Sequence, residues 1–191
     1  MSFHKNFAKL AETLQEELHL SINQISDREV QRFLSELLEA ERIFIAGKGR
    51  TGLQMRSFAM RLMHLGLRVH VVDDVTTPAI GSGDLLIVGS ASGKTSSLVA
   101  YAEIAEKIGA KLIAITSNTD NPISKRSSVN IVIPAPSHKN SANVNRIPSI
   151  LPLGGLFELA LGFLLNLLVV QLIEELGIEE SEMIDRHANL E

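Results

Sequence analysis

A loop rich in hydroxyl groups carries the clearest chemical signal in this sequence: Ser90-Ala91-Ser92-Gly93-Lys94-Thr95. Ser90, Ser92 and Thr95 supply hydrogen-bond donors. Gly93 lets the backbone approach a bound group closely. A helix is expected to begin at the end of this loop, and the first N–H groups of a helix have no partner inside it. Together these groups favour a bound anion such as a phosphate, and a serine-rich loop without a ligand is the alternative.

The end of this loop resembles an ATP-binding P-loop, but the spacing of its glycines differs. The P-loop pattern requires a glycine at residue 88, and that residue is Val88. The nearest glycine, Gly89, is one position too close. We therefore expect anion binding at this loop and disfavour an ATP-type P-loop.

A second loop rich in glycine, Gly47-Lys48-Gly49-Arg50-Thr51-Gly52, follows an expected strand and opens an expected helix. It matches the G-x-G-x-x-G pattern of dinucleotide-binding proteins, and Asp73 stands about twenty residues on, where such proteins bind a ribose hydroxyl. A nicotinamide-dependent oxidoreductase is therefore one alternative, although Lys48 and Arg50 place two cations in the turn. Glycines that only shape a tight turn are another. The candidate ligand-binding residues of this loop are Gly49, Arg50 and Thr51.

The elements that position these loops follow from the alternation of short apolar runs with helical stretches. Strands are expected at residues 42–46, 68–72, 85–89, 111–116 and 129–134, and helices between them at 51–65, 95–108 and, shorter, 121–127. The strands are continuous apolar runs, which is typical of a parallel sheet covered on both faces. The sequence therefore predicts an α/β fold, a three-layer α/β/α sandwich around a five-stranded parallel sheet with right-handed crossovers.

The remaining regions are expected to be helical, so that residues 1–191 form one domain. Residues 1–40 indicate two amphipathic helices divided near Ser26, where Ser26 and Glu29 have the spacing of a capping box. Residues 41–135 hold the sheet and its crossover helices, and residues 151–191 the C-terminal helices. If the strand order is the flavodoxin-like 2-1-3-4-5, both candidate loops meet at its switch point, where such sheets bind ligands.

Composition restricts the classes of function. A net charge of −4 argues against a surface that coats nucleic acid, and the absence of cysteine excludes disulfides and thiolate chemistry. The first five residues lack the apolar run of a signal peptide, which predicts a cytoplasmic protein. Residues 151–173 are apolar and long enough to cross a bilayer, but they include Glu158 and Asn166. We expect a buried or subunit-interface helix there and no membrane partner.

The pattern Ser90-x-Ser92-Gly93-x-Thr95 after a strand resembles the phosphosugar loop of the SIS (sugar isomerase) domain. Four further stretches resemble the 6-phospho-3-hexuloisomerases: residues 58–66 (FAMRLMHLG), 77–81 (TPAIG), 156–158 (LFE) and 186–191 (RHANLE). The resemblance runs from about residue 41 to the C-terminus, and the helical N-terminus also fits.

Some positions depart from the pattern of this family. Lys94 stands where the family has an acid, and Lys48 and Thr51 stand where it has Ala and Ser. Residues 147–152 also differ from the usual run before the Leu-Phe-Glu motif. Phosphate binding is still expected, and these changes bear on substrate specificity.

The resemblance implies an isomerase that interconverts 3-hexulose 6-phosphate and fructose 6-phosphate through an enediol, in formaldehyde fixation or pentose phosphate supply. A carboxylate can abstract the proton if burial raises its pKa, and Glu158 lies in an apolar helix where that shift is expected. A neutral imidazole suits the transfer of the hydroxyl proton, and His187 is the candidate. A favourable contact with the helix dipole for Glu158, and a surface position for His187, are the structural alternatives. This route needs no metal and no cofactor.

The resemblance also implies a homotetramer in which the long apolar helix and the N-terminal helices are buried between subunits. The expected partners are therefore a sugar phosphate and further copies of the chain, without nucleic acid. A non-catalytic SIS module that senses a sugar phosphate is the main rival. It would bind fructose 6-phosphate and leave it unchanged.

Overall fold

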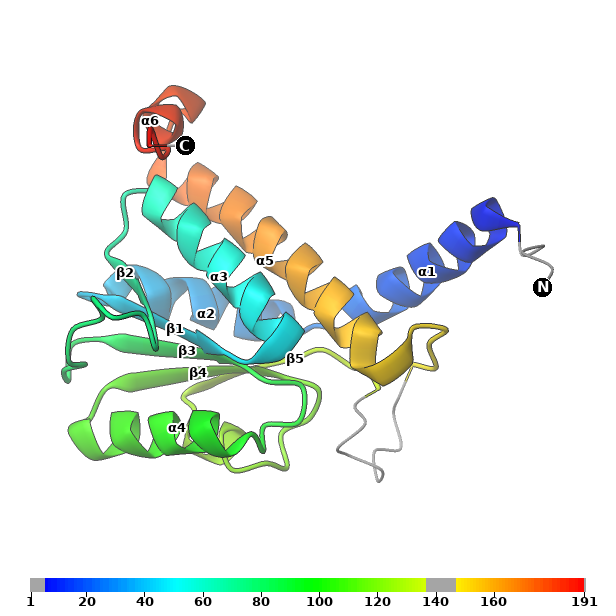
Figure 1. Ribbon diagram of the computed structural model, residues 1–191, viewed down its shortest axis with the longest axis horizontal. Coiled ribbons are helices and arrows are strands. Elements are labelled where there is room, and N and C mark those ends of the chain that lie inside the picture. Colours follow the sequence, from blue (N-terminus) through cyan, green and yellow to red (C-terminus); the bar gives the residue numbers. More distant parts are fainter. Residues whose placement is uncertain (1–5, 137–146, 191) are drawn as a thin grey trace.

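The computed structural model describes residues 6–136 and 147–190 (Figure 1). Residues 1–5, on which the signal-peptide prediction rests, and Glu191 of the terminal hexapeptide lie outside the described residues. The strands are β1 (Ile43–Gly47), β2 (Val69–Val71), β3 (Leu85–Gly89), β4 (Lys111–Thr116) and β5 (Val129–Val132). The α-helices are α1 (Phe7–Ile22), α2 (Asp27–Glu39), α3 (Gly49–His64), α4 (Ser96–Ile108), α5 (Gly155–Leu176) and α6 (Glu180–Asp185). Two 3₁₀ helices, η1 (Ser124–Arg126) and η2 (Pro152–Gly154), complete the described elements.

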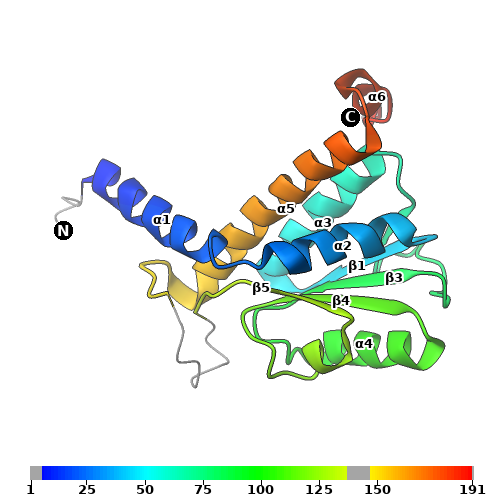
Figure 2. The same cartoon turned by 180° about the vertical axis from the view of Figure 1, so that it is seen from behind.

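The strands form one parallel sheet in the order β2-β1-β3-β4-β5, as the sequence predicts. Helices α2, α3 and α5 cover one face of the sheet, and α4 covers the other (Figures 1 and 2). The predicted three-layer α/β/α sandwich is therefore confirmed. Its switch point lies between β1 and β3, because the helix after β1 (α3) packs on one face of the sheet and the helix after β3 (α4) packs on the other.

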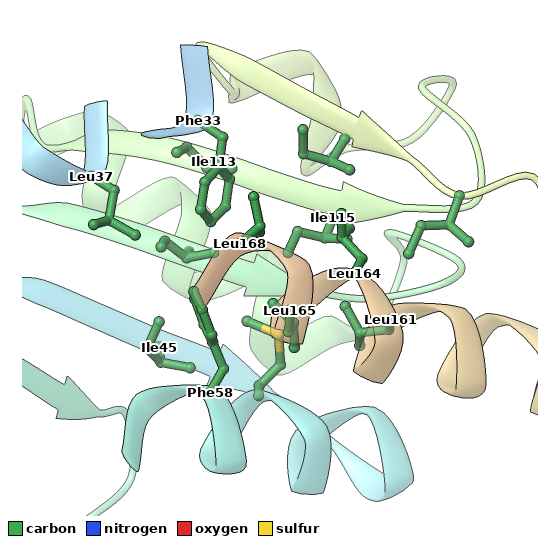
Figure 3. Close-up of a cluster of buried hydrophobic side chains, with 14 of the residues drawn as sticks. Phe33, Leu37, Ile45, Phe58, Ile113, Ile115, Leu161, Leu164, Leu165 and Leu168 are labelled. Carbon is green, nitrogen blue, oxygen red and sulfur yellow. The ribbon is translucent and has the colours of Figure 1, made fainter. Parts of the chain in front are cut away.

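The continuous apolar runs of the strands are explained by burial on both faces. Ile43 and Ile45 of β1 point into the core under α3 and α5, whereas Phe44 and Ala46 pack toward α4. Each of these four side chains is at most 3% exposed. Figure 3 shows the larger core, where leucines of α5 lie between the isoleucines of the sheet and Phe58 of α3.

Helix α5 is the central helix of this larger core. The segment Pro152–Leu176 is long and apolar enough to cross a membrane. However, half of its most apolar stretch is buried inside the molecule. Nine side chains of α5 are buried, which is the pattern of a core helix. A row on its outer side is left partly exposed: Leu159, Phe163, Leu167 and Val170 are 40–53% accessible.

The N-terminal helices divide where the sequence predicts. Ser26 caps α2 by accepting a hydrogen bond from the Glu29 N–H at 3.4 Å. The Glu29 side chain does not complete the capping box, because it contacts Arg32 and the backbone of Asn130 instead. Helix α1 lies against the first half of α5 and projects beyond the sheet (Figure 2).

Two expected helices differ most from the structure, whereas β1, β2, β5 and α4 differ from their expected bounds by only one or two residues at an end. The crossover helix predicted for residues 51–65 begins earlier, at Gly49, because Gly49 and Arg50 already form its first turn. The helix predicted for residues 121–127 is only the 3₁₀ turn η1. There the Asn121 side chain accepts hydrogen bonds from the N–H groups of Ile123 and Ser124, which replaces a regular helical start.

Candidate functional site

A cleft of about 290 Å³ opens at the carboxyl ends of β1 and β3, the predicted switch point. Both candidate loops line it, as does the start of α5. The lining residues from the loops are Lys48, Gly49, Arg50, Thr51, Gly89, Ser90, Ala91, Ser92 and Thr95. Leu98 of α4, together with Leu153, Gly154, Phe157 and Glu158, closes the opposite side. Eight of the nine residues predicted for the site therefore belong to this cleft or its loops, and His187 does not.

The Ser90–Thr95 loop is folded tightly over the end of β3. Ser90 is 6% and Ser92 is 4% exposed. The Ser90 hydroxyl oxygen accepts a hydrogen bond from the Gly93 N–H at 3.2 Å, and the Ser92 hydroxyl oxygen accepts one from the Lys94 N–H at 3.2 Å. These bonds hold the loop in a tight turn, and Ser90, Ser92 and Thr95 of this turn line the cleft.

Gly93 has two reasons to be glycine. Its φ is 62°, in the left-handed region that side chains rarely adopt. An added Cβ would also lie 2.0 Å from the side chain of Asn121. Asn121 is 1% exposed and holds the next loop through hydrogen bonds to Asn118 and Ser124. The phosphate-binding candidate loop is therefore supported from behind by a buried amide.

Three helices begin at the cleft: α3, α4 and α5 (Figure 1). Their N-cap residues are Lys48, Thr95 and Gly154, and none of the three makes a side-chain capping hydrogen bond. The first N–H groups of each helix therefore face the cleft region with the positive end of the helix dipole. This arrangement favours an anion such as phosphate.

Glu158 enters the cleft from the first turn of α5, and its side chain is 17% exposed. The Arg50 Nε from α3 donates a hydrogen bond to Glu158 Oε2, and the two groups form an ion pair. The expected lone acid among apolar side chains is therefore only partly found, since a guanidinium from a distant loop contacts it. Arg50 itself is 78% exposed, and the pair lies at the rim of the cleft.

The dinucleotide alternative is weakened by what surrounds the first loop. Gly47 and Gly52 are in close contact, because an added Cβ on Gly52 would lie 2.7 Å from the Gly47 carbonyl oxygen. Packing thus explains these two glycines. Asp73, the candidate ribose acceptor, receives a hydrogen bond from the Tyr101 hydroxyl at 2.6 Å and an ion pair from Lys48. Hydrogen bonds from Lys48 and then Tyr101 lower the pKa of the Asp73 carboxyl.

His187 lies at the other end of the molecule from Glu158. It follows α6, which lies beyond the end of α3 (Figure 1), and its ring stacks on that of His64, with ring centroids 5.1 Å apart. Arg50 and His64 are at opposite ends of α3, which corresponds to about 20 Å along the helix. Burial, and then the charges of His187 and Arg61, lower the pKa of His64. Within one chain, His187 and Glu158 are not brought together.

Sequence comparison places these features in a known family. The model of the SIS domain matches residues 36–159, which include both loops and Glu158. The chain belongs to the SIS domain family. A 3-hexulose-6-phosphate isomerase of Bacillus subtilis is 39% identical over 175 residues, covering 92% of this chain and 94% of that protein. One of Mycobacterium gastri is 40% identical over 168 residues, covering 87% and 82%.

A solved structure extends this likeness beyond the matched residues 36–159 to almost the whole chain. MJ1247 of Methanococcus jannaschii superposes with a TM-score of 0.83 at 30% identity, covering 96% of this chain and 99% of that one. Its structure is described as inferring a molecular function of 3-hexulose-6-phosphate isomerase. The similarity thus extends over almost the full length of both proteins and includes the segments on both sides of the cleft.

Several residues of this SIS domain site were missed by the sequence reasoning. Leu153 has a positive φ of 55° and, with Phe157, forms the apolar wall of the cleft. The sequence carries no signal for that wall beyond the glycines beside it. Asn121 could have been found, since Asn-Pro is a turn dipeptide. Lys48 is noted in the sequence as a cation in the turn and as a departure from the family pattern, but not as a site residue, yet it lines the cleft.

Proposed function

We propose that this chain isomerises 3-hexulose 6-phosphate and fructose 6-phosphate. The observation that carries the proposal is the cleft itself, in which a hydroxyl-rich loop and three open helix N-termini face one carboxylate, Glu158. The full-length relatives named 3-hexulose-6-phosphate isomerase support the same substrate pair. In a cell the reaction would follow the condensation of formaldehyde with ribulose 5-phosphate, or supply pentose phosphate in reverse.

The phosphate of the substrate is proposed to bind the Ser90–Thr95 loop. Ser90, Ser92 and Thr95 line the cleft at the start of α4, where the helix dipole favours a dianion. The apolar wall made by Leu153 and Phe157 then borders the carbon chain of the sugar. In this pose the sugar extends from the phosphate loop toward Glu158 on the opposite side.

Glu158 is the proposed base. It would remove the proton from C2, next to the C3 carbonyl, and return a proton at C3 after the electrons have moved through a C2–C3 enediol. Arg50 holds Oε2, which leaves Oε1 to face the substrate proton. The ion pair fixes the carboxylate at the mouth of the cleft, which is the positioning that general base catalysis needs.

His187 is proposed to move the hydroxyl proton between O2 and O3, and this role requires a second copy of the chain. Within one chain the imidazole lies beside His64, far from Glu158. Only a neighbouring subunit can bring it to the cleft. The partly exposed apolar row on α5 supports such an assembly, for which the family resemblance favours a homotetramer.

Light scattering at micromolar concentration tests the assembly. An oligomer, with four subunits favoured, is expected. Mixing an inactive Glu158→Gln chain with an inactive His187→Asn chain then tests the shared site. Activity is expected to return in the mixed oligomer, because some clefts receive both native side chains. A monomer, or a mixture without activity, would contradict this role of His187.

The reaction is tested by incubating the pure protein with fructose 6-phosphate and detecting the 3-ketose, with solvent deuterium entering C3 of fructose 6-phosphate. Conversion without an added cofactor is expected. The Ser92→Ala/Thr95→Ala and Glu158→Gln variants are the controls for binding and for chemistry. A protein that binds fructose 6-phosphate and leaves it unchanged would instead be a sensor, and the proposed isomerase function would be wrong.

A further inference from the structure

Lys48 is a cation in the cleft for which the proposed reaction has no role so far. It is the last residue before α3, its backbone is extended, and it lines the cleft. Among the described residues that line the cleft, the other cation is Arg50, whose charge pairs with Glu158. A bound substrate phosphate carries roughly two negative charges. The Ser90–Thr95 loop itself offers hydroxyl and N–H groups to this phosphate.

The register of the sheet places Lys48 directly beside the phosphate loop. Gly47, the last residue of β1, pairs with Gly89, the last residue of β3. Lys48 and Ser90 therefore leave neighbouring strands side by side, about 5 Å apart at their backbones. The ammonium group at the end of a lysine side chain can reach across that distance.

The Lys48 ammonium is already ordered without a substrate. It forms an ion pair with Asp73 and lies 5.6 Å from the ring centroid of Tyr101, a residue of α4. Asp73 has a φ of 79°, a left-handed conformation that is uncommon for residues other than glycine. This strained residue and the helix that begins at the phosphate loop thus hold one cation between them.

The contact with Asp73 also keeps the Lys48 side chain positively charged. A hydrogen bond from Lys48 to Asp73 raises the pKa of the lysine, so that it stays protonated at neutral pH. Lys48 remains 41% and Asp73 49% exposed, so their mutual ion pair is weak and can be shared with a second anion. A phosphate dianion is a stronger attractor than one exposed carboxylate.

We infer that Lys48 is a further substrate-binding residue, whose ammonium group pairs with the phosphate held by the Ser90–Thr95 loop. This inference rests on the proposed function, because it takes a sugar phosphate as the ligand. It assigns to Lys48 the charge neutralisation that the hydroxyl groups of the loop do not provide. Before the substrate arrives, Asp73 and Tyr101 hold the ammonium on the β2 side of β1, and the side chain would turn from there toward Ser90 on the β3 side.

The test compares Lys48→Met with Lys48→Arg and with a matched control, Lys111→Met. Lys111 is likewise a partly exposed lysine in an ion pair, with Glu39, but it lies at the opposite end of the sheet. The measurements are KM for fructose 6-phosphate and the inhibition constant of inorganic phosphate. Lys48→Met is expected to raise both by about tenfold, the effect of losing a hydrogen bond to a charged group. Lys48→Arg should stay within a few-fold of wild type.

Each outcome decides the inference separately from the proposed function. If wild type and Lys111→Met convert fructose 6-phosphate and Lys48→Met has an unchanged KM, the role of Lys48 is wrong and the isomerase proposal stands. If KM rises but inhibition by phosphate is unchanged, Lys48 contacts the sugar and its pairing with phosphate is wrong. If wild type shows no conversion, the proposed function itself fails. Since the chain has one tyrosine and no tryptophan, fluorescence of Tyr101 gives an independent binding signal beside Lys48.

Discussion

The two ends of the sheet differ in how completely their charged side chains are paired within the chain. At the amino end, Asp84 stands just before β3 and is 2% exposed. Arg42 contacts both of its oxygens, at 2.9 and 2.6 Å, and the Gly81 N–H donates a third hydrogen bond at 2.6 Å. This buried carboxylate is therefore fully paired within the chain, as burial of a charge requires.

At the carboxyl end of the sheet, the polar groups are not fully paired within the chain as Asp84 is. The N-caps of α3, α4 and α5 make no side-chain capping bonds, and the ion pairs of Glu158 and Lys48 are partly exposed. Such groups contribute little to folding, because exposed pairs are weak and uncapped helix ends cost stability. The comparison indicates that the amino end stabilises the fold, whereas the carboxyl end leaves polar groups available for the proposed substrate.

The largest expected effect is at the carboxyl end. Glu158→Gln keeps the shape of the side chain but removes the proton acceptor, so turnover should fall by about 10²–10⁴-fold. Binding of fructose 6-phosphate should persist, because the phosphate loop is untouched. Urea unfolding should change little, since the ion-pair partner Arg50 is 78% exposed and the pair lies at the rim of the cleft. A variant that keeps more than about a tenth of wild-type turnover would show that Glu158 is structural.

The next largest effect is expected at the amino end of the sheet, on stability and not on turnover. Asp84→Asn removes the charge that Arg42 pairs with, and we expect the free energy of unfolding to fall by about 2–4 kcal/mol. Turnover measured well below the unfolding temperature should stay near wild type. Urea unfolding and a steady-state assay on the same sample check both parts. A loss of turnover without a loss of stability would overturn the division between the two ends.

A smaller effect is expected for the phosphate loop. Ser92→Ala/Thr95→Ala should weaken the binding of fructose 6-phosphate by about 1–3 kcal/mol, the scale of hydrogen bonds to a charged group. Ser128→Ala is the matched control, because its hydroxyl contacts Glu36 and the Leu112 carbonyl at the amino end. Isothermal titration of all three proteins measures the difference. Equal affinities would place the phosphate elsewhere.

The smallest effect concerns acid. Burial tends to raise the pKa of the Asp84 carboxyl, but hydrogen bonds from Arg42 and the Gly81 N–H outweigh it and lower that pKa. Because the pKa of Asp84 is lower in the folded state, its ionised carboxylate stabilises the fold at pH values above its usual pKa of 3.8. This stabilisation is lost as the pH falls through the lower pKa of the folded state. The free energy of unfolding, measured with urea from pH 6 down to pH 3, should therefore fall more in wild type than in Asp84→Asn. Parallel curves for the two proteins would contradict this.

Much of the fold could be predicted from the sequence because its signals are local. The bounds of β3 and β4 were predicted to the residue, since apolar runs between polar turns are short-range patterns. The strand order was a conditional prediction, and the structure confirms it. The two loops of the cleft were likewise predicted, because glycines and hydroxyl residues after a strand are readable without the rest of the chain.

Contacts between distant elements were decided by the tertiary structure alone. Arg50 and Glu158 are 108 residues apart, and only the packing of α3 beside α5 joins them. The same packing direction separates His187 from Glu158, since both helices begin at the cleft and end near His64. Local patterns determine where a helix starts and which side chains it carries. How it is placed against another helix depends on how their side chains interlock across the core, and that is a property of the whole chain.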